Sequence, residues 1–233
     1  MNLIEILNKG CIIHTSGTTG PSKPIEQPID KIKSANKIAR DVQMITKESK
    51  VYTVCSMNHA GGLFAQTLPA IEIKAQVHTE LFNPFKWVNS IKDFTHSHLT
   101  PAMAEAITRT KSWKDIDLTK KIIACGSDRV PASIVNKFVE KGCTFITNWG
   151  MSEVGPIAIN KTFTPASSEA KDLDIDGRTC TLMGDEIFVE TRISEWNELS
   201  VKGDISVYKD WFATGDVVKF VEGQYWYYGR KTS

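Results

Sequence analysis

Hydrophobic positions in the first two-thirds of the chain follow two alternating periods. Short apolar runs rich in Val, Ile and Thr are typical of buried strands, and between them apolar residues recur every three or four positions, as on one face of a helix. The clearest helical stretch has Asp30 as its expected cap and places Ile32, Ala35 and Ile45 on one face. Strand, helix and strand in succession predict a largely parallel sheet with flanking helices. The expected strands are 11–15, 51–56, 75–79, 97–100, 122–125 and 144–148, and the other expected helices are 1–10, 84–94 and 131–141.

The pattern changes after about residue 160. The stretches "EIFVET" (186–191), "ISVY" (205–208), "FATGDVVKF" (212–220) and "QYWYYG" (224–229) are short, alternating or aromatic, and Gly, Asp and Asn separate them. They predict a small antiparallel β-sheet or barrel. The chain is therefore expected to consist of a layered α/β subdomain over 1–160 and a small β subdomain over 161–233.

The amino-acid composition argues against several classes of binding partner. The 233 residues include 28 Lys and Arg against 27 Asp and Glu, so the chain lacks the basic excess that neutralises phosphate backbones or anionic lipid. Neither nucleic acid nor a membrane surface is an expected partner. The longest uncharged run, 51–71, contains Asn58, Gln66 and Pro69, which a lipid-facing helix would avoid. The five cysteines form no C-x-x-C pair and indicate reduced, mostly buried thiols, so a cytoplasmic protein is expected.

Polar loops that contain glycine follow four of the predicted strands. These loops are "TSGTTG" after 11–15, "MNHAGG" after 51–56, "GSDR" after 122–125 and "WGMSE" after 144–148. Open α/β sheets bind ligands beyond the carboxyl ends of their strands, so the four loops are expected to converge on one crevice. In the first loop, glycines permit close approach to an anion, and hydroxyls with Lys23 supply donors and charge, which suits phosphate. A plain surface turn explains its composition equally well, and its spacing is not that of a Walker loop.

Four motifs together resemble a known family. "HTSGTTGPSK" (14–23) is similar to the phosphate loop of the AMP-forming adenylating superfamily, which includes acyl- and aryl-CoA synthetases, luciferases and peptide-synthetase adenylation domains. "NWGMSE" (148–153) and "FATGD" (212–216) resemble its second and third signatures, and "YGRKTS" (228–233) resembles the start of its interdomain hinge. The motifs occur in the family's order and, with "MNHAGGL" and "CGSDRVP", extend the resemblance over nearly the whole chain.

The resemblance implies roles at an ATP/AMP site. The loop 15–23 would hold the β- and γ-phosphates, Ser152 would face the α-phosphate where the family usually has threonine, and Glu153 would bind Mg²⁺. Asp216 would accept the ribose hydroxyls beside Arg230. The implied catalytic residues are Thr15, Lys23, Ser152 and Glu153, with Glu153 also the metal ligand. The implied nucleotide-binding residues are Thr15, Ser16, Gly17, Thr18, Thr19, Gly20, Lys23, Gly126, Ser127, Asn148, Trp149, Gly150, Met151, Ser152, Asp216 and Arg230.

Some of these residues also have a plain structural interpretation. Trp149 replaces the family's usual tyrosine and would stack beside adenine, although a tryptophan is more often a large packing residue. Glu153 alone would be read as solvated surface and the "TGD" that ends at Asp216 as a turn. His96 and His98 alternate onto one face of a strand, but no third ligand lies at metal-site spacing, so both are read as structural.

The resemblance places a substrate carboxylate near His59, Gly61 and Gly62. Adenylating domains that select amino acids carry an aspartate in this loop, whereas Asn58 and His59 offer no fixed negative charge for an ammonium group. An aryl or aliphatic acid is therefore expected, in an apolar pocket that includes the neighbouring apolar side chains. Alternatively, two of those neighbours, Leu63 and Phe64, merely pack the following helix.

Family members also carry a segment before the phosphate loop and a C-terminal lid whose lysine stabilises the adenylation transition state. Here 13 residues precede His14, and the sequence stops at Ser233, where the hinge aspartate would fall. Two hypotheses stay open. One is an enzyme that forms an acyl-adenylate and pyrophosphate, with coenzyme A as a candidate acceptor, and that is slow unless a partner chain or a second copy supplies the lid. The other is a non-catalytic nucleotide- or acyl-adenylate-binding module.

Overall fold

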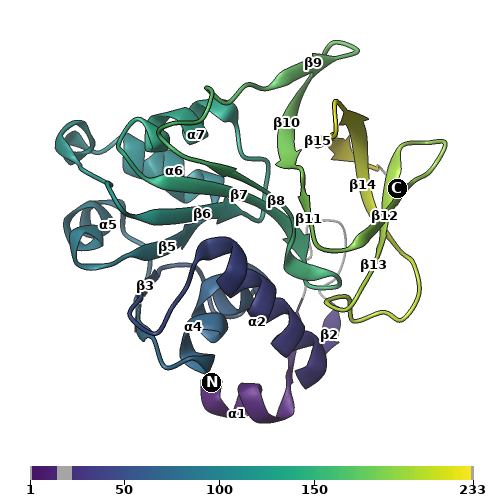
Figure 1. The fold of residues 1–233 in the computed structure, drawn as a ribbon, viewed down its shortest axis with the longest axis horizontal. Helices are drawn as coiled ribbons and strands as arrows, with labels where there is room; N and C mark the ends of the chain where they lie inside the picture. The colour runs from purple at the N-terminus through teal and green to yellow at the C-terminus, as the bar shows by residue number, and fades with distance from the viewer. Residues whose placement is uncertain (1, 15–22, 232–233) are drawn as a thin grey trace.

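The computed structural model describes residues 2–14 and 23–231. Two sheets lie beside each other, one of seven strands and one of six, and a separate two-stranded hairpin lies near the N-terminus (Figure 1). Helices cover both faces of the larger sheet, whereas the smaller sheet consists of strands and the loops between them. This arrangement confirms the α/β fold with a small antiparallel β part that the sequence predicts.

The seven-stranded sheet has the order β11-β8-β7-β6-β5-β3-β4. Its strands β3 to β7 are parallel to one another, and the two strands at the other edge, β8 and β11, are antiparallel additions. The five predicted strands from 51 to 148 all lie in the parallel part. The strands are β3 (Lys50–Thr53), β4 (Gln76–Thr79), β5 (His96–Leu99), β6 (Ile122–Gly126), β7 (Thr144–Met151), β8 (Gly155–Phe163) and β11 (Glu186–Ile187).

Helices cover this sheet because its inner strands are buried on both sides. Tyr52 packs in a core with Trp87 and Phe138, which belong to the helices on one face. The preceding residue on the strand, Val51, points the other way and packs with Ala70. The first face carries α5 (Pro84–Ser90), α6 (Pro101–Thr108) and α7 (Ala132–Val139), with short 3₁₀ turns at η2 (Ile91–Asp93) and η3 (Lys111–Asp115). The second face carries α1 (Leu3–Lys9), α2 (Ile29–Gln43), α3 (Ala60–Gly62), the π-helical turn η1 (Leu63–Thr67) and α4 (Leu68–Glu72).

The start of the long helix differs from the expected one. Helix α2 begins at Ile29, its N-cap residue is Pro28, and no side chain caps it. Asp30 lies inside the first turn, where its charge is favourable beside the helix N-terminus. The prediction that Asp30 caps the helix is therefore wrong. Proline supplies the extended backbone that a cap needs without a side-chain bond, because its ring fixes φ.

The first predicted strand is not part of the parallel sheet. Strand β1 (Cys11–His14) pairs antiparallel with β2 (Pro24–Gln27) in a hairpin of their own. Ile13 and Ile25 on this hairpin pack among the apolar side chains of α1, α2 and η1. The hairpin therefore lies on the helical layer of the second face, and the loop 15–22 that it flanks does not follow a strand of the main sheet.

The small sheet is antiparallel throughout, with the order β12-β13-β14-β15-β10-β9. Two expectations fail in detail. The stretch 186–191 divides between the two sheets, and 205–208 forms no strand, because the backbone N–H of Val207 bonds the carbonyl of Glu153 instead of a neighbouring strand. The strands are β9 (Leu173–Ile175), β10 (Arg178–Gly184), β12 (Glu190–Ile193), β13 (Glu198–Lys202), β14 (Phe212–Val221) and β15 (Gln224–Arg230).

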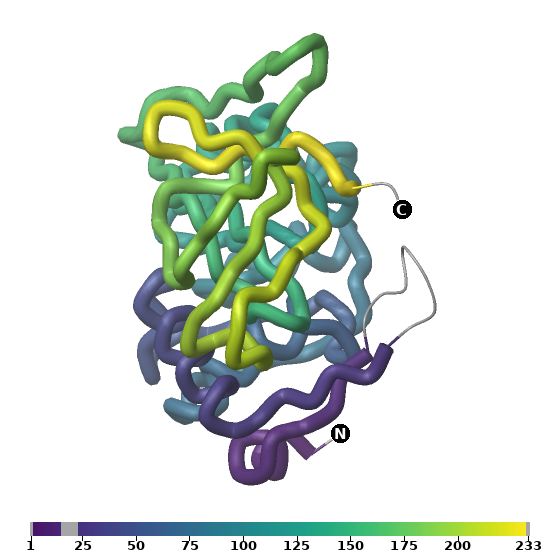
Figure 2. The backbone as a smooth tube through the Cα atoms, turned by 90° about the vertical axis from the view of Figure 1, so that its right-hand side faces the viewer, coloured from purple at the N-terminus to yellow at the C-terminus, as the bar shows by residue number. Residues whose placement is uncertain are grey.

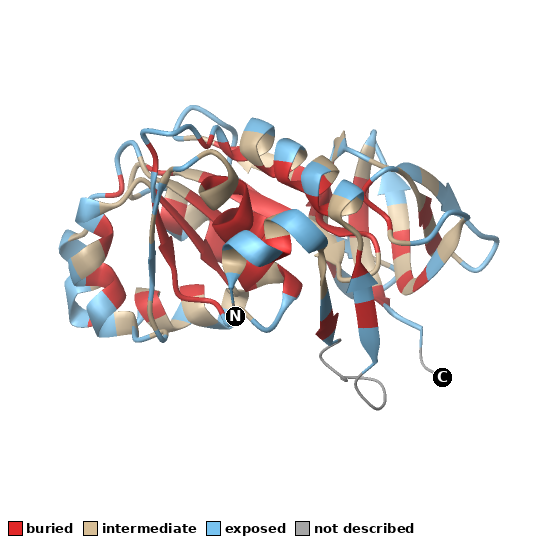
Figure 3. Ribbon diagram, turned by 90° about the horizontal axis from the view of Figure 1, so that it is seen from below, coloured by how far each residue is buried: buried red, intermediate tan, exposed pale blue. Residues whose placement is uncertain are grey.

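One hydrophobic core joins the two sheets. Ala158 and Ile159 of β8 pack with Leu199, Val218 and Tyr225 of the small sheet. Figure 2 shows the small sheet running across the face of the molecule in front of the large one, and Figure 3 shows buried residues concentrated on the inner strands. The predicted boundary at residue 160 falls inside strand β8, and β11, which comes later in the sequence, belongs to the large sheet. The division into subdomains 1–160 and 161–233 stays a prediction. In the part of the chain that the structure describes, no helix has both the length and the apolar character to cross a membrane.

Candidate functional site

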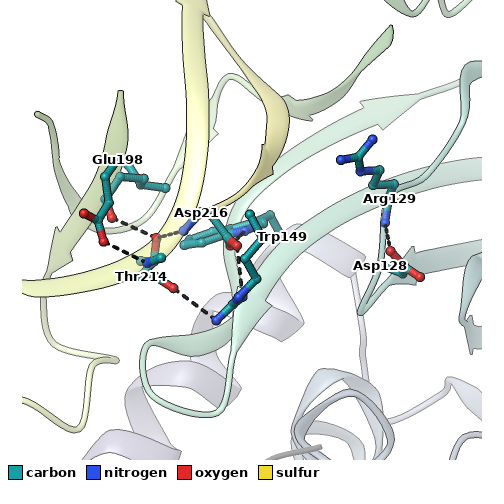
Figure 4. A network of polar contacts seen from close by, with 9 residues as sticks. Asp128, Arg129, Trp149, Glu198, Thr214 and Asp216 are labelled. Carbon is teal, nitrogen blue, oxygen red and sulfur yellow. Dashed lines mark hydrogen bonds and ion pairs between the residues drawn. The ribbon is translucent and has the colours of Figure 1, made fainter. Parts of the chain in front are cut away.

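The carboxylate of Asp216 lies where the two sheets meet. It is 3% exposed, its Oδ1 accepts a hydrogen bond from Arg230 Nη1 at 2.9 Å, and its Oδ2 accepts one from Trp149 Nε1 at 2.9 Å. Asp216 and Arg230 are neighbours on β14 and β15, whereas Trp149 comes from β7 of the large sheet. Figure 4 shows Trp149 and Asp216 converging from the two sheets. Three residues that the sequence assigns to nucleotide binding are thus in direct contact.

The "TGD" segment is held in place by its own strand neighbours. Thr214 Oγ1 donates to the carbonyl of Leu199 at 2.8 Å and accepts the backbone N–H of Asp216 at 3.1 Å. Gly215 has a φ of 75°, which a residue with a side chain adopts only with strain, and its N–H donates to Glu198 Oε1 at 3.2 Å. Glu198 also forms an ion pair with Lys231 at 3.1 Å. The backbone that presents Asp216 is therefore fixed on both sides.

Electrostatics at Asp216 reflect burial opposed by two donors. Burial raises the pKa of this carboxyl, while the indole N–H of Trp149 and the charge of Arg230 lower it, and the charge of Glu153 raises it further. Glu153 is thus close enough to Asp216 to act on it electrostatically. The arrangement holds one buried, paired carboxylate beside a second acidic side chain that is half-buried.

Trp149, Gly150 and Met151 lie on a strand, not in the loop that the sequence analysis expected. Strand β7 continues to Met151 because it forms a hairpin with β8, in which Met151 pairs with Gly155. Gly150 must be glycine there, since a Cβ would lie 2.3 Å from the carbonyl oxygen of Gly155. Ser152 and Glu153 follow at the hairpin turn and are half-buried.

Two contacts outside the predicted site hold this hairpin turn. Gln27, at the end of β2, donates from Nε2 to the carbonyl of Ser152 at 2.8 Å, and Val207 N donates to the carbonyl of Glu153 at 3.0 Å. Gln27 therefore connects the hairpin that flanks the first polar loop to the turn that carries Ser152 and Glu153. The sequence analysis missed Gln27, and no local signal marks it, because its partner lies 125 residues away.

Gly126, Ser127 and Asn148 come together where β6 ends beside the middle of β7. Gly126 and Asn148 are register partners, and a Cβ on Gly126 would lie 2.4 Å from the carbonyl oxygen of Asn148. Ser127 is exposed and has a φ of 72°, an uncommon backbone conformation for a serine. Asn148 is anchored, since its Nδ2 donates to the carbonyl of Pro156 at 2.9 Å. The close approach of the two strands thus depends on a glycine at position 126.

The predicted substrate residues adjoin this group. A Cβ on Gly61 would lie 2.7 Å from Ser127 Oγ, so the "MNHAGG" and "GSDR" segments meet. His59 is exposed and precedes helix α3. Gly62 packs against the backbone of Ser56, where a Cβ would lie 2.1 Å from its carbonyl oxygen. Leu63 and Phe64 are buried in the core formed with α1, α2 and the β1–β2 hairpin, so the packing interpretation applies to these two.

His98, which the sequence analysis interpreted as structural, is a buried neighbour of this group. Its Nε2 lies 3.3 Å from Asn148 Oδ1 and its Nδ1 lies 3.6 Å from Cys55 Sγ, while its Cε1 would lie 3.3 Å from a Cβ on Gly61. Burial lowers the pKa of His98 to about 4, so the ring is neutral at neutral pH. His96 is also buried, with Nε2 2.9 Å from the carbonyl oxygen of Gln43.

Arg129 is a second residue that the sequence analysis left without a role. Its guanidinium carbon lies 4.9 Å from the centroid of the Tyr227 ring, and its Nη2 lies 3.5 Å from the carbonyl oxygen of Tyr228. Burial raises the pKa of Tyr227, while Arg129 and Arg230 lower it. The loop after β6 therefore contacts the strand that carries Arg230.

The remaining predicted residues belong to the first polar loop of the sequence. Thr15, Ser16, Gly17, Thr18, Thr19 and Gly20 fall outside the described residues. Lys23 is described and exposed, next to Pro24, which pairs with His14 across the β1–β2 hairpin. Among the described residues, no three His, Cys, Asp or Glu side chains gather as metal ligands. Mg²⁺ commonly takes one or two carboxylates together with substrate phosphates and water, so a single Glu153 fits such a role.

Comparisons with known proteins show the family to which the chain belongs. The sequence profile described as "AMP-binding enzyme" matches residues 10–204. An indoleacetate–CoA ligase of Aromatoleum aromaticum is 29% identical over 245 residues, which cover 94% of this chain and 47% of the ligase. A feruloyl-CoA synthase of an Amycolatopsis species is 32% identical over 57 residues, 24% of this chain and 12% of that protein. The chain thus spans about half the length of the indoleacetate–CoA ligase.

Solved structures share the fold at low sequence identity. ATP-bound MatB from Rhodopseudomonas palustris superimposes with a TM-score of 0.76 at 19% identity and covers 95% of this chain and 48% of MatB. The adenylation domain of a keto acid-selecting NRPS module, bound to a keto acyl adenylate, has a TM-score of 0.78 at 15% identity, over 94% of this chain and 51% of that domain.

Proposed function

This chain belongs to the family of AMP-binding enzymes, and from that premise we propose that it binds ATP and AMP at Asp216 and takes part in activating a carboxylic acid. In the reaction, a carboxylate oxygen attacks the α-phosphorus of ATP. The bond from that phosphorus to the bridging oxygen breaks, which gives an acyl-adenylate and pyrophosphate. The observation that carries the proposal is the Asp216 carboxylate, buried yet oriented by Arg230 and Trp149.

Adenosine would bind between the ends of β6 and β7 and the "TGD" segment. A paired carboxylate with lone pairs remaining on both oxygens suits the two hydroxyls of a ribose. Gly126, Ser127 and Asn148 would face the adenine, and Trp149 would lie beside it. The tight contact between Gly126 and Asn148 supports this proposal, because it keeps side-chain bulk away from the place where the base would lie.

The phosphates would extend toward the β7–β8 turn. Ser152 would offer a hydroxyl to the α-phosphate, and Glu153 would bind Mg²⁺ shared with the phosphates. Lys23 and the loop 15–20 would hold the β- and γ-phosphates, where charge on the leaving pyrophosphate develops. The bond from Gln27 to Ser152 supports this proposal, since it connects the strand after that loop to the turn.

The carboxylate substrate would lie beside His59, Gly61 and Gly62. We propose an aryl or aliphatic acid, with coenzyme A as a candidate acceptor for the activated acyl group. The contact between Gly61 and Ser127 supports a shared wall between acid and nucleotide. The similarity to an indoleacetate–CoA ligase supports an aryl acid.

Calorimetry with AMP and MgATP tests the binding part of the proposal. Asp216→Asn removes the charge of the side chain and leaves its size almost unchanged. The affinity for AMP should fall by about 10- to 100-fold, since a hydrogen bond to a charged group contributes roughly 1.5–3 kcal/mol. Asp210→Asn is the matched control, because Asp210 has a side chain that is 96% exposed. If the wild-type chain bound neither nucleotide, or if Asp216→Asn bound AMP normally, the proposal would fail.

ATP–pyrophosphate exchange tests the reaction. The assay uses indoleacetate, benzoate and medium-chain acids with free amino acids as the comparison, and is run with and without a superfamily lid domain added in trans. Exchange that depends on an aryl or aliphatic acid supports the enzyme. Nucleotide binding with no exchange under any of these conditions would favour the non-catalytic binding module.

A further inference from the structure

Trp149 contacts the ribose-acceptor carboxylate through the edge of its ring. The indole Nε1 donates to Asp216 Oδ2 at 2.9 Å, while Arg230 Nη1 donates to the other oxygen at 2.9 Å. The two donors come from different sheets, since Trp149 is on β7 and Arg230 is on β15. The indole also packs against the core that joins the sheets, together with Met151 and Tyr227. Its N–H is therefore aimed by packing that does not involve Asp216 itself.

A second donor changes what the carboxylate can do. The terminal torsion of an aspartate side chain is broad, so one donor on one oxygen leaves the plane of the carboxylate poorly defined. Donors on both oxygens fix that plane. An ionised carboxylate has about four acceptor positions, so each oxygen of Asp216 keeps one for a further donor. Two fixed acceptors on adjacent oxygens match two hydroxyls on adjacent carbons.

We propose that Trp149 is a positioning residue for ribose recognition, in which its indole N–H orients the Asp216 carboxylate toward the 2′- and 3′-hydroxyls of the nucleotide. This inference rests on the proposed function, because it requires that AMP binds here. It differs from the adenine stacking expected from the sequence, which uses the ring face and not the N–H. The two roles are separable, since phenylalanine keeps an aromatic face and lacks the donor.

The test compares AMP with 2′,3′-dideoxy-AMP, whose sugar lacks both hydroxyls. Calorimetric dissociation constants are measured for the wild type, Trp149→Phe and a control, Trp113→Phe, which changes a half-buried tryptophan on η3. If Trp149 orients the carboxylate, Trp149→Phe should lower the affinity for AMP by about 5- to 10-fold and the affinity for dideoxy-AMP by less than about twofold. Trp113→Phe should alter neither. Equal weakening of both nucleotides would show that the ring face alone matters and would overturn the inference.

A more conservative variant guards against misfolding. Site-specific replacement of Trp149 by 3-benzothienylalanine exchanges the N–H for sulfur and keeps the shape of the ring. It should reproduce the selective loss of AMP affinity, and wild-type affinity for AMP in this variant would refute the role of the donor. Failure of the proposed function looks different, because the unaltered chain would then bind neither AMP nor dideoxy-AMP.

The pH dependence of AMP binding supplies a second readout. Arg230 on β15 and Glu153 at the β7–β8 turn act on the pKa of Asp216, and the charge of Asp216 raises the pKa of Tyr227 on β15. Trp149→Phe leaves all three in place but removes a donor to the ionised carboxylate, which raises the pKa of Asp216. Since binding needs the ionised form, affinity should begin to fall at a higher pH in the variant. A purely structural tryptophan would leave this acid limb where it is.

Discussion

Acidification should destabilise the fold through His98. The ring is buried between Cys55 and Asn148, and burial lowers its pKa from the usual 6.5 to about 4. Between these two values the unfolded chain binds a proton that the folded chain does not. Stability therefore falls as the pH drops through this window, and the loss is complete below the folded-state pKa. His96 acts in the same direction, since burial lowers its pKa as well.

The size of the effect follows from the two pKa values. Linkage gives a loss from His98 of about 2 kcal/mol between pH 7.5 and pH 5, out of about 3.4 kcal/mol below pH 4. A domain of this size shifts its melting temperature by roughly 2–4 °C per kcal/mol, so the pH 5 loss corresponds to about 4–8 °C. The bond to Asn148 favours the charged ring, but desolvation is the larger effect.

Urea unfolding at pH 7.5 and pH 5 measures this loss in the wild type and in His98→Gln. Glutamine places an amide near the position of Nε2 and does not titrate. Carboxylates also titrate on acidification, so the informative quantity is the difference between the two proteins in their pH-dependent change. That difference should be about 2 kcal/mol. A difference below about 0.5 kcal/mol would show that His98 is not a neutral buried imidazole, whatever the absolute stability of His98→Gln.

Two further predictions concern the site. Glu153→Gln should lower the affinity for MgATP, measured by calorimetry, more than the affinity for AMP, because the charge of Glu153 would act on the phosphates through Mg²⁺. An equal loss of affinity for both nucleotides would assign Glu153 a structural role. Gly126→Ala should lower the free energy of unfolding by about 1–3 kcal/mol and reduce AMP affinity, since the new Cβ would lie 2.4 Å from a backbone oxygen. Gly203→Ala is its control, because a Cβ there would lie 3.4 Å from Val189, an ordinary van der Waals distance. Similar losses in both variants would contradict the steric argument.

The sequence predicted the parallel sheet well because the signal for it is local. Most of the strands β3 to β7 are short segments that contain Val, Ile or Thr, and each expected helix carries its own three- and four-residue period. The resemblance also pointed to Asp216, Arg230 and Trp149, which the structure places in direct contact. What it did not give was the geometry of that contact, because the indole and the carboxylate lie 67 positions apart.

The expectations that failed depend on strand pairings and contacts that no local pattern in the sequence indicates. The segment 11–14 has the composition of a buried strand, but its partner is 24–27 and not a strand of the large sheet. Strand β7 continues through Gly150 because it pairs antiparallel with β8, and no local pattern in the sequence predicts that pairing. His98 is buried, as its structural interpretation implies, but its contacts with Cys55, in the segment after β3, and with Asn148 on β7 were not predicted, because both residues are distant in the sequence.

The core between the sheets would preorganise the proposed nucleotide site. Ile159 on β8 and Leu199, Val218 and Tyr225 on the small sheet pack together, so Trp149 and Asp216 are held at a fixed separation without a ligand. A preorganised acceptor lowers the cost of ordering on binding, and it does so equally for AMP and ATP. Acceleration requires groups that act on charge developing at the phosphates, and the candidates for that are Glu153 and the loop 15–23. Changes at Asp216 should therefore alter the affinity for both nucleotides alike, whereas changes at Glu153 should separate ATP from AMP.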